Sequence, residues 1–235
     1  MYLGMCSEEL TARPLTPLPV PNSICRIMTI SKHLYLAPLA TICILLAGCS
    51  NPADKTESAE VGAAVDAVKA VADAATYSIS SDSTISFVGS KVTGSHEGGF
   101  ESFEGTIAVA NGKIVPPSKV TIQMDSLWSD SNRLTGHLKS PDFFDVAKYP
   151  NAEFAVTSMR DTPQGTEMTG NLTLHGVTKS ITFKPEVSIS DDEVTLKAEF
   201  DIMRFDFGIV YKGKVDDLIR DEVVIKLDVR ASAEG

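Results

Sequence analysis

Apolar and polar residues alternate along most of the chain after Tyr77. Alternation with a period of two is typical of β-strands that bury one face. It predicts about eight strands, at residues 84–92, 102–110, 118–125, 152–159, 166–174, 178–190, 193–203 and 222–231. Turn-forming pairs such as Asn111-Gly112 and Lys212-Gly213 separate them. No helix alternates regularly with the strands, so we expect an all-β, antiparallel fold rather than a parallel sheet.

One segment, residues 132–149, interrupts this pattern and predicts a short helical insertion. Asn132 can cap a first helix, and Ser140, followed by a proline, can cap a second. Phe143 and Phe144 would then point about 100° apart and could not share one packing partner. Either one packs against the sheet while the other plugs an end, or one of them lines an apolar tunnel.

The first part of the chain is typical of an export signal. Residues 34–48 are apolar but shorter than the roughly 20 residues of a membrane span, and they end in small residues. Leu46-Ala47-Gly48-Cys49 looks like a bacterial lipobox, in which the signal is cleaved before the cysteine and the thiol is acylated. The alternative is a plain secretory signal with an incidental cysteine. Residues 1–27 are proline-rich and do not suit a signal, so we expect translation to begin at Met28.

The predicted organisation is therefore a signal peptide over residues 1–48, a lipidated flexible tether over 49–76, and a barrel domain over 77–235. The tether segment is rich in Ala, Ser, Asp and Glu. A flexible segment of this length has a root-mean-square reach of about 30 Å. A weak amphipathic helix within it is the alternative.

Charge and cysteine content limit the partners. The full chain carries a net charge of −10, and removal of residues 1–48 leaves 18 basic and 29 acidic residues, a net of −11. Such a chain repels nucleic acid and anionic lipid surfaces, so membrane attachment is expected through the acylated Cys49. No cysteine follows Cys49, so the rest of the chain has no internal disulfide.

Catalytic and metal-binding signatures are missing from the sequence. We find no nucleophile elbow, phosphate-binding glycine loop or metalloprotease helix. The histidines at positions 96, 137 and 175 lack the spacing of a metal site. We therefore expect a protein that is not an enzyme and has no metal or cofactor.

Three stretches carry a resemblance to a known family. They are Gly98-Gly-Phe-Glu-Ser-Phe-Glu-Gly105, the segment from His137 to Pro150, and Gly170-Asn-Leu-Thr-Leu-His-Gly-Val-Thr-Lys-Ser-Ile-Thr-Phe183. Together they resemble the YceI-like family of bacterial periplasmic proteins. The resemblance implies a lipocalin-like, eight-stranded barrel that holds a polyisoprenoid or similar apolar chain. Lys139 departs from the family pattern, which has an arginine there, and Thr135 and Gly136 stand where an acidic residue is usual.

On this resemblance, an apolar ligand would contact mainly aromatic side chains. The candidate ligand-binding residues are Phe87, Phe100, Phe103, Trp128, Arg133, His137, Phe143, Phe144, Phe154, Phe183 and Phe200. Ordinary packing remains the alternative for several of them, and we favour it for Trp128. The acidic charge favours a ligand with a neutral head, such as a quinone or an amide, unless Arg133, Lys139, Lys179 and Arg204 gather at the mouth.

The expected function is that of a lipid-anchored binding protein of the bacterial envelope, holding an isoprenoid-type amphiphile for storage, transport or stress protection. Ser50, rather than Asp, follows the acylated cysteine, which favours the outer membrane over the inner one. Two alternatives stay open: a packed barrel that binds a protein partner on its outer surface, and an enzyme that acts on the bound lipid. A homodimer is also left open.

Overall fold

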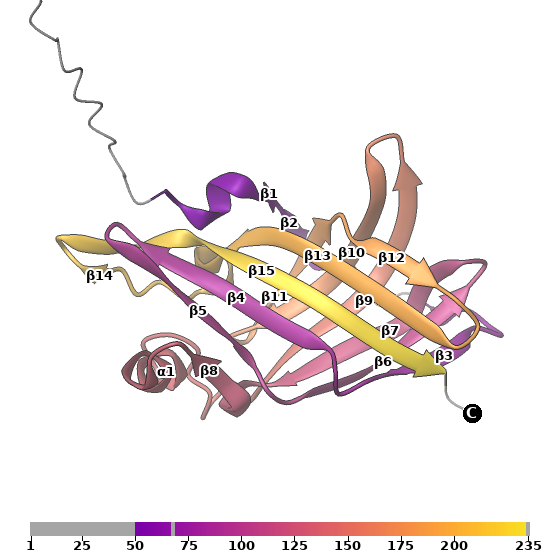
Figure 1. Ribbon diagram of the computed structural model, residues 1–235, viewed down its shortest axis with the longest axis horizontal. Coiled ribbons are helices and arrows are strands. Elements are labelled where there is room, and N and C mark those ends of the chain that lie inside the picture. Colours follow the sequence, from indigo (N-terminus) through magenta and orange to yellow (C-terminus); the bar gives the residue numbers. More distant parts are fainter. Residues whose placement is uncertain (1–49, 67–68, 234–235) are drawn as a thin grey trace, which may run out of the picture. The chain divides into compact units, whose positions relative to one another are not determined.

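The computed structural model describes residues 50–66 and 69–233 of the chain, coloured by sequence in Figure 1. The predicted signal peptide, the predicted start at Met28 and the predicted acylation site at Cys49 lie outside the described residues. The strands are β1 (Glu57–Ser58), β2 (Glu60–Ala63), β3 (Ala75–Ile79), β4 (Thr84–Lys91), β5 (Gly94–Phe100), β6 (Phe103–Ala110), β7 (Lys113–Gln123), β8 (Leu127–Ser129), β9 (Asn151–Thr162), β10 (Gly165–Leu174), β11 (Val177–Phe183), β12 (Glu186–Ile189), β13 (Glu193–Met203), β14 (Gly213–Lys214) and β15 (Asp217–Ala233). The helical elements are α1 (Asn132–Lys139) and the 3-10 turns η1 (Pro52–Lys55), η2 (Met124–Ser126) and η3 (Arg204–Phe207).

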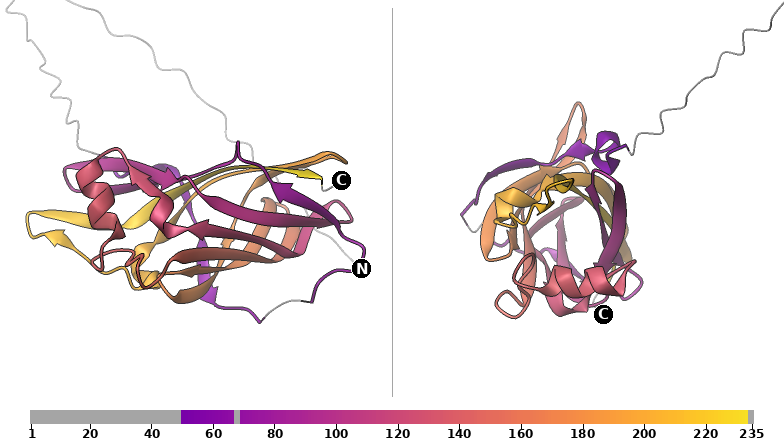
Figure 2. Two further views of the ribbon diagram at one scale, coloured as in Figure 1. Left: turned by 90° about the horizontal axis from the view of Figure 1, so that it is seen from below. Right: turned by 90° about the vertical axis from the view of Figure 1, so that its left-hand side faces the viewer.

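Several strands continue one another across a bend, so the main sheet consists of eight long segments. β3 continues into β4, β5 into β6, β7 into β8, and β11 into β12. Antiparallel pairing connects β3/β4 to β5/β6, then to β7/β8, β9, β10, β11/β12, β13 and β15. β15 pairs in turn with β3 and β4, which returns the sheet to its first segment. Figure 2 (right) shows the strands as a ring with α1 along one side. The predicted all-β, antiparallel, lipocalin-like barrel is confirmed.

The strand prediction missed some segments for local reasons. β5 reads Gly-Ser-His-Glu-Gly-Gly-Phe, which has no regular apolar alternation, and it was not predicted. The predicted strand 178–190 bends at Lys184-Pro185, because proline cannot donate to the ladder. Before the bend the chain pairs with β10, and after it with β13.

The helical insertion is present, but only its first half is a helix. Ser131, rather than Asn132, caps α1 by accepting a hydrogen bond from the Leu134 backbone N–H. The predicted second helix is wrong. The chain after Ser140 forms successive turns, in which the Phe144 N–H donates to the Leu138 carbonyl at 3.0 Å and Asp145 has a φ of 45°. Phe143 and Phe144 therefore lie on a turn, and the 100° separation expected on a helix does not hold for them.

The segment expected to be a flexible tether is instead attached to the barrel. β2 pairs with β11 in antiparallel fashion, and β1 pairs with β13 in parallel fashion. β11 and β13 are not paired with each other along this stretch, so both would otherwise present unpaired backbone groups. The N-terminal segment, residues 51–63, thus fills a gap in the wall and is part of the barrel.

Hydrogen bonds from the N-terminal segment support this position. Thr56 donates its hydroxyl to Asp201 Oδ1 at 2.8 Å, and the Ala59 N–H donates to the Asp201 carbonyl at 2.8 Å. Asp201 is only 1% exposed, so these bonds lie in a desolvated part of the wall. Further along the chain, the Val65 backbone bonds the Asn171 side chain in both directions, at 2.9 and 2.7 Å.

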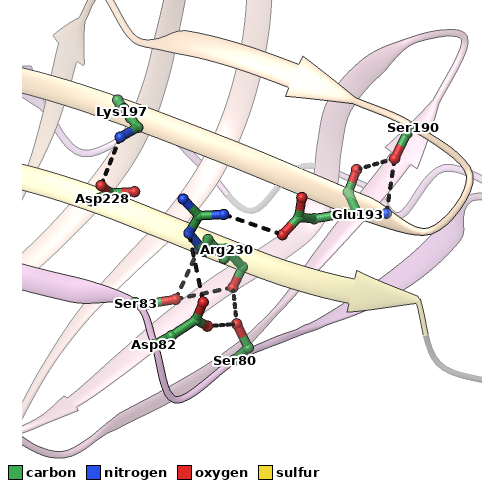
Figure 3. A network of polar contacts seen from close by, with 8 residues as sticks. All are labelled: Ser80, Asp82, Ser83, Ser190, Glu193, Lys197, Asp228 and Arg230. Atoms are coloured by element: carbon green, nitrogen blue, oxygen red, sulfur yellow. Dashed lines mark hydrogen bonds and ion pairs between the residues drawn. The ribbon is translucent and has the colours of Figure 1, made fainter.

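The end of the barrel away from α1 is held by a polar network (Figure 3). The Arg230 guanidinium lies 3.6 Å from both Asp82 and Glu193, and its backbone carbonyl accepts hydrogen bonds from the Ser80 and Ser83 hydroxyls. Asp191 and Asp192 form the adjacent, exposed β12–β13 turn. This end of the barrel is therefore strongly polar.

Candidate ligand cavity

The barrel encloses a cavity of about 490 Å³. Its volume lies in the range of about 300–1,000 Å³ that is usual for small-molecule sites. The deep part of its wall is apolar and includes Ile107, Ile114, Phe154, Val156, Met168, Ile181, Phe183, Leu196, Phe200 and Val229. The interior is thus not filled by side chains, which was the alternative that the sequence left open.

Strand alternation explains which residues face the cavity. On β4, Ile85, Phe87 and Gly89 line it, whereas the intervening Val88 is buried on the other face. β13 contributes Leu196, Phe200 and Ile202 in the same way, and β15 contributes Val223, Ile225, Leu227 and Val229. The period-two pattern of the sequence is therefore the pattern of the cavity wall.

Three aromatic rings pack together where α1 meets the cavity. The His137 ring is 5.0 Å from both the Phe143 and Tyr211 rings, edge to face, and Phe143 is 5.2 Å from Tyr211. His137 Nε2 is 3.0 Å from Asp142 Oδ2, which fixes the orientation of the imidazole. All three rings line the cavity, and so does Phe144, which packs in the same apolar cluster as Phe143. Both phenylalanines therefore contribute to the wall.

Glycines make room for aromatic rings in the wall. A Cβ at Gly98 would lie 2.4 Å from the Phe87 ring, and one at Gly170 would lie 2.4 Å from the Phe154 ring. A Cβ at Gly99 would lie 3.1 Å from the Trp128 indole, which packs over this backbone. Gly98 and Gly99 therefore allow Phe87 and Trp128 to lie close to the β5 backbone.

Several polar groups of the cavity lie at the α1 end, while Thr106, Ser118 and Lys119 line it on β6 and β7. Arg204 is buried and donates to the carbonyls of Ile209, Arg220 and Ile219 at 2.6, 2.9 and 3.2 Å. Burial lowers the pKa of its guanidinium, and the Asp221 carboxylate acts in the opposite direction. Lys91 forms an ion pair with Asp217.

Two further cations, Lys214 and Arg220, line the same part of the cavity. Arg220 Nε is buried without a hydrogen-bond partner among the described residues. The rim thus offers hydrogen-bond donors, whereas the deep wall is apolar.

The structure brings most of the predicted ligand-binding residues together. Eight of them line the cavity: Phe87, Phe100, His137, Phe143, Phe144, Phe154, Phe183 and Phe200. Three do not. Phe103 is half-buried on β6, Arg133 is exposed on α1, and the Trp128 ring is 40% exposed against Gly99. The position of Trp128 agrees with the packing role that we favoured.

Of the four cations considered for the mouth, only Arg204 lines the cavity. Lys139 bonds the Asp125 carbonyl instead, and Lys179 lies on β11 beside β2. Sequence reasoning missed Tyr211, Lys91, Asp217 and Arg220. Tyr211 stands in Ile-Val-Tyr-Lys-Gly, a stretch with no alternation to indicate its direction. Asp217 and Arg220 precede the predicted strand 222–231, and Lys91 lies near the end of the predicted strand 84–92, where alternation gives no sign of an ion pair.

The other histidines have separate partners. His96 Nδ1 is 2.8 Å from Asp130 Oδ1. His175 lies in the β10–β11 turn, and its Nδ1 is 3.3 Å from the carbonyl of Phe207 in η3. Within residues 50–66 and 69–233, no three His, Cys, Asp or Glu side chains are grouped as a metal site would require. In the same residues, no helix is both long enough and apolar enough to cross a membrane.

Comparison with known proteins extends the picture. Two UPF0312 proteins of Pseudomonas putida, strains F1 and W619, are each 39% identical to the chain over 120 residues, which is 47% of this chain and 61% of the relative. The chain thus spans about three fifths of the length of the curated relatives it matches.

Solved structures share the fold. BcnA of Burkholderia cenocepacia superposes with a TM-score of 0.54 at 24% identity, over 63% of this chain and 96% of that one. A polyisoprenoid binding domain from Saccharophagus degradans superposes with a TM-score of 0.56 at 18% identity, over 69% of this chain and all of that one (100%). The sequence model of the YceI-like domain matches residues 77–231, so the chain belongs to the YceI-like family.

Proposed function

We propose that the protein binds an isoprenoid-like amphiphile, with the apolar tail inside the barrel and the polar head at the α1 end. The observation that carries this proposal is the cavity of about 490 Å³ with an apolar deep wall. Each methylene transferred from water into such a site contributes about 0.8 kcal/mol. Ten methylenes contribute roughly 8 kcal/mol before the cost of immobilising the ligand is subtracted. Tail burial alone is therefore a sufficient source of affinity.

The polar rim supports a head that accepts hydrogen bonds. Arg220 Nε has no hydrogen-bond partner within the part of the chain that the structure describes, and Lys214 lines the same region. The positive charge of Lys91 is compensated by Asp217, and the Arg204 donors are directed at backbone carbonyls. These features provide donors for an acceptor head, and the acidic character of the chain favours a neutral one, such as a quinone or amide carbonyl.

Two further observations support the proposal, one from the sequence and one from a protein of similar fold. The lipobox-like Leu46–Cys49 supports acylation of Cys49, and with it attachment to the periplasmic face of the outer membrane. The solved domain from S. degradans is described as polyisoprenoid-binding, which supports the same ligand class for this chain. We propose binding without turnover, because the sequence carries no nucleophile elbow, phosphate-binding glycine loop or metalloprotease helix.

The proposal is tested by purifying the full chain from the membrane fraction of a bacterial host and extracting its lipid for mass spectrometry. We expect a neutral molecule with a long isoprenoid or acyl tail. Mainly prenyl diphosphates in the extract would reject the neutral head but leave the cavity proposal intact. The stripped protein is then mixed with an apolar fluorescent probe, and uptake that long-chain isoprenoids do not displace would reject the cavity as the binding site. Ligand recovered chemically altered after incubation would support the enzyme instead.

A further inference from the structure

Large apolar side chains are exposed around the cavity at the α1 end. In all, eight large apolar side chains are exposed anywhere among the described residues: Val65, Val71, Val92, Trp128, Phe205, Val210, Val215 and Leu218. Five of them, Val92, Phe205, Val210, Val215 and Leu218, are direct sequence neighbours of cavity-lining residues. Neighbouring residues of a strand or turn point in different directions, so one faces the cavity while the next faces solvent.

Three of these five lie on two adjacent hairpin tips, and we call Val92, Val215 and Leu218 the apolar tip. The Val92 N–H donates to the Leu218 carbonyl at 3.2 Å, which joins the β4–β5 turn to β15. Val215, in the β14–β15 turn, is 96% exposed. Figure 1 shows β14 projecting from the barrel beside the end of β4. A side chain this exposed contributes nothing to the fold by burial, so its apolar character is unexplained by packing.

Charge near the apolar tip differs from that of the whole chain. Residues 91–94 and 210–218 carry three lysines and two aspartates, whereas the full chain has a net charge of −10. Lys212 and Lys214 precede Val215, Asp216 follows it, and all three charged residues are exposed. The opposite end of the barrel carries the exposed Asp191 and Asp192 and the charged network of Figure 3. The two segments that carry the apolar tip thus have a small excess of positive charge, unlike the chain as a whole.

The chain also enters the barrel at this end. Asn51 is buried, and its side-chain oxygen accepts a hydrogen bond from the Ser90 hydroxyl at 3.3 Å. Ser90 is two residues before Val92 of the apolar tip. The 3-10 turn that follows Asn51 contacts β15 (Figure 1). Cys49 is two residues before Asn51, and two extended residues span at most about 7 Å. An acyl group on Cys49 therefore cannot be far from the apolar tip.

We propose that the apolar tip inserts into the lipid bilayer, so that the cavity opens towards the membrane that supplies its ligand. This inference rests on the proposed function, because acylation of Cys49 brings the tip to the bilayer. A flexible tether over residues 49–76 would hold the barrel up to about 30 Å from the bilayer. Because Asn51 is bonded to the barrel, only two residues separate the proposed anchor from the barrel wall, which would then lie against the bilayer. A lipid then moves from the bilayer to the cavity without its tail crossing water.

The test uses tryptophan fluorescence in vesicles that contain brominated phosphatidylcholine and phosphatidylglycerol. The chain has one tryptophan, so Trp128→Phe provides a silent background. In this background, Val215→Trp places a probe at the apolar tip, and Gln164→Trp places one in the exposed β9–β10 turn at the opposite end. We expect the probe at 215 to be quenched several times more strongly than the probe at 164. Equal quenching, or no quenching at 215, overturns the proposal.

A second measurement is independent of the probes. Val215→Asp and Leu218→Asp should slow the transfer of a fluorescent prenyl lipid from vesicles to the protein by roughly tenfold or more. Neither side chain lines the cavity, so affinity for the same lipid added without vesicles should not change. Val65→Asp makes the same change at an exposed valine elsewhere and should leave transfer unaffected. Equal slowing in all three variants, or none, contradicts the proposal.

The mass of the purified protein separates this inference from the anchor on which it rests. If Cys49 carries no acyl chains, the anchor proposal fails. The unacylated protein with the probe at 215 is then mixed with excess vesicles, and quenching of that probe still decides whether the apolar tip inserts. If the chain is acylated but the tip is not quenched, the anchor stands and the docking proposal fails.

Discussion

Gly89→Phe is the substitution that tests the cavity most directly. Gly89 lies on β4 with its α-carbon facing the cavity, and an added Cβ there meets no atom within 4 Å. Its backbone has no positive φ, so a larger residue causes no strain. A phenylalanine at this position would occupy part of the ligand volume without displacing the wall.

The expected loss of affinity follows from burial. If the new ring excludes about three methylenes of the tail, the loss is roughly 2.4 kcal/mol at 0.8 kcal/mol each. This corresponds to an increase in Kd of about 50-fold. Stability should not fall, because the ring fills space that is otherwise empty in the ligand-free protein.

Gly94→Phe is the matched control. Gly94 lies on the partner strand β5, an added Cβ there also meets nothing within 4 Å, and the residue does not line the cavity. Titration with a fluorescent prenyl lipid should give an unchanged Kd for Gly94→Phe and a raised one for Gly89→Phe. If Gly89→Phe binds as tightly as the parent protein, or if both variants weaken binding equally, the ligand does not occupy this cavity.

Three further predictions concern stability. Gly98→Ala should destabilise the protein by about 1–3 kcal/mol, because its Cβ would lie 2.4 Å from the Phe87 ring and 2.6 Å from the Trp128 carbonyl. Gly62→Ala, with open space around the added Cβ, is the control. Equal melting temperatures of the two variants would show that the site is not crowded. Thr56→Val should lower the free energy of unfolding in urea by about 1–3 kcal/mol, because the buried Asp201 carboxylate loses its hydroxyl donor. Thr178→Val, which removes a hydroxyl from an exposed pair of threonines, is the control and should lower it less. An equal loss in both variants would mean that the N-terminal segment is not bonded to the barrel. The hydrogen bond from Lys91 lowers the pKa of Asp217 below its usual 3.8, so the pair stabilises the fold above that pH and the stabilisation fades as the pH falls through the lowered value. The difference in unfolding free energy between the parent protein and Lys91→Gln should therefore be present at neutral pH and shrink in acid. A difference that grows in acid would contradict this assignment.

The barrel could be predicted from the sequence because its wall is one face of alternating strands. Phe87, Phe154, Phe183 and Phe200 each sit in such an alternation, and each faces the cavity. Burial of one strand face is a local property, so periodicity alone indicates it. The turn at Asn111-Gly112 was equally local, and both residues have the positive φ values, 53° and 70°, that this pair tolerates.

Other features depend on contacts between distant residues and were not accessible in this way. The helical prediction after Ser140 failed because the turns around Phe143 are set by tertiary packing on Tyr211, which lies far along the chain. The N-terminal segment is polar and looks like a linker, yet its backbone pairs with β11 and β13. Composition gives no sign that a polar segment will add to a sheet edge, because such pairing uses backbone groups that every residue carries.

The N-terminal segment connects the architecture of the barrel to its proposed task. The family match begins at residue 77, yet the wall between β11 and β13 is completed by residues 57–63. The same segment is fixed at Asn51 beside the cavity end that carries the apolar tip. With the proposed anchor at Cys49, a free linker would let the barrel turn in any direction above the membrane, whereas a segment bonded to the wall up to Asn51 would hold the α1 end near the anchor. Sealing the wall and orienting the opening thus depend on the same few hydrogen bonds.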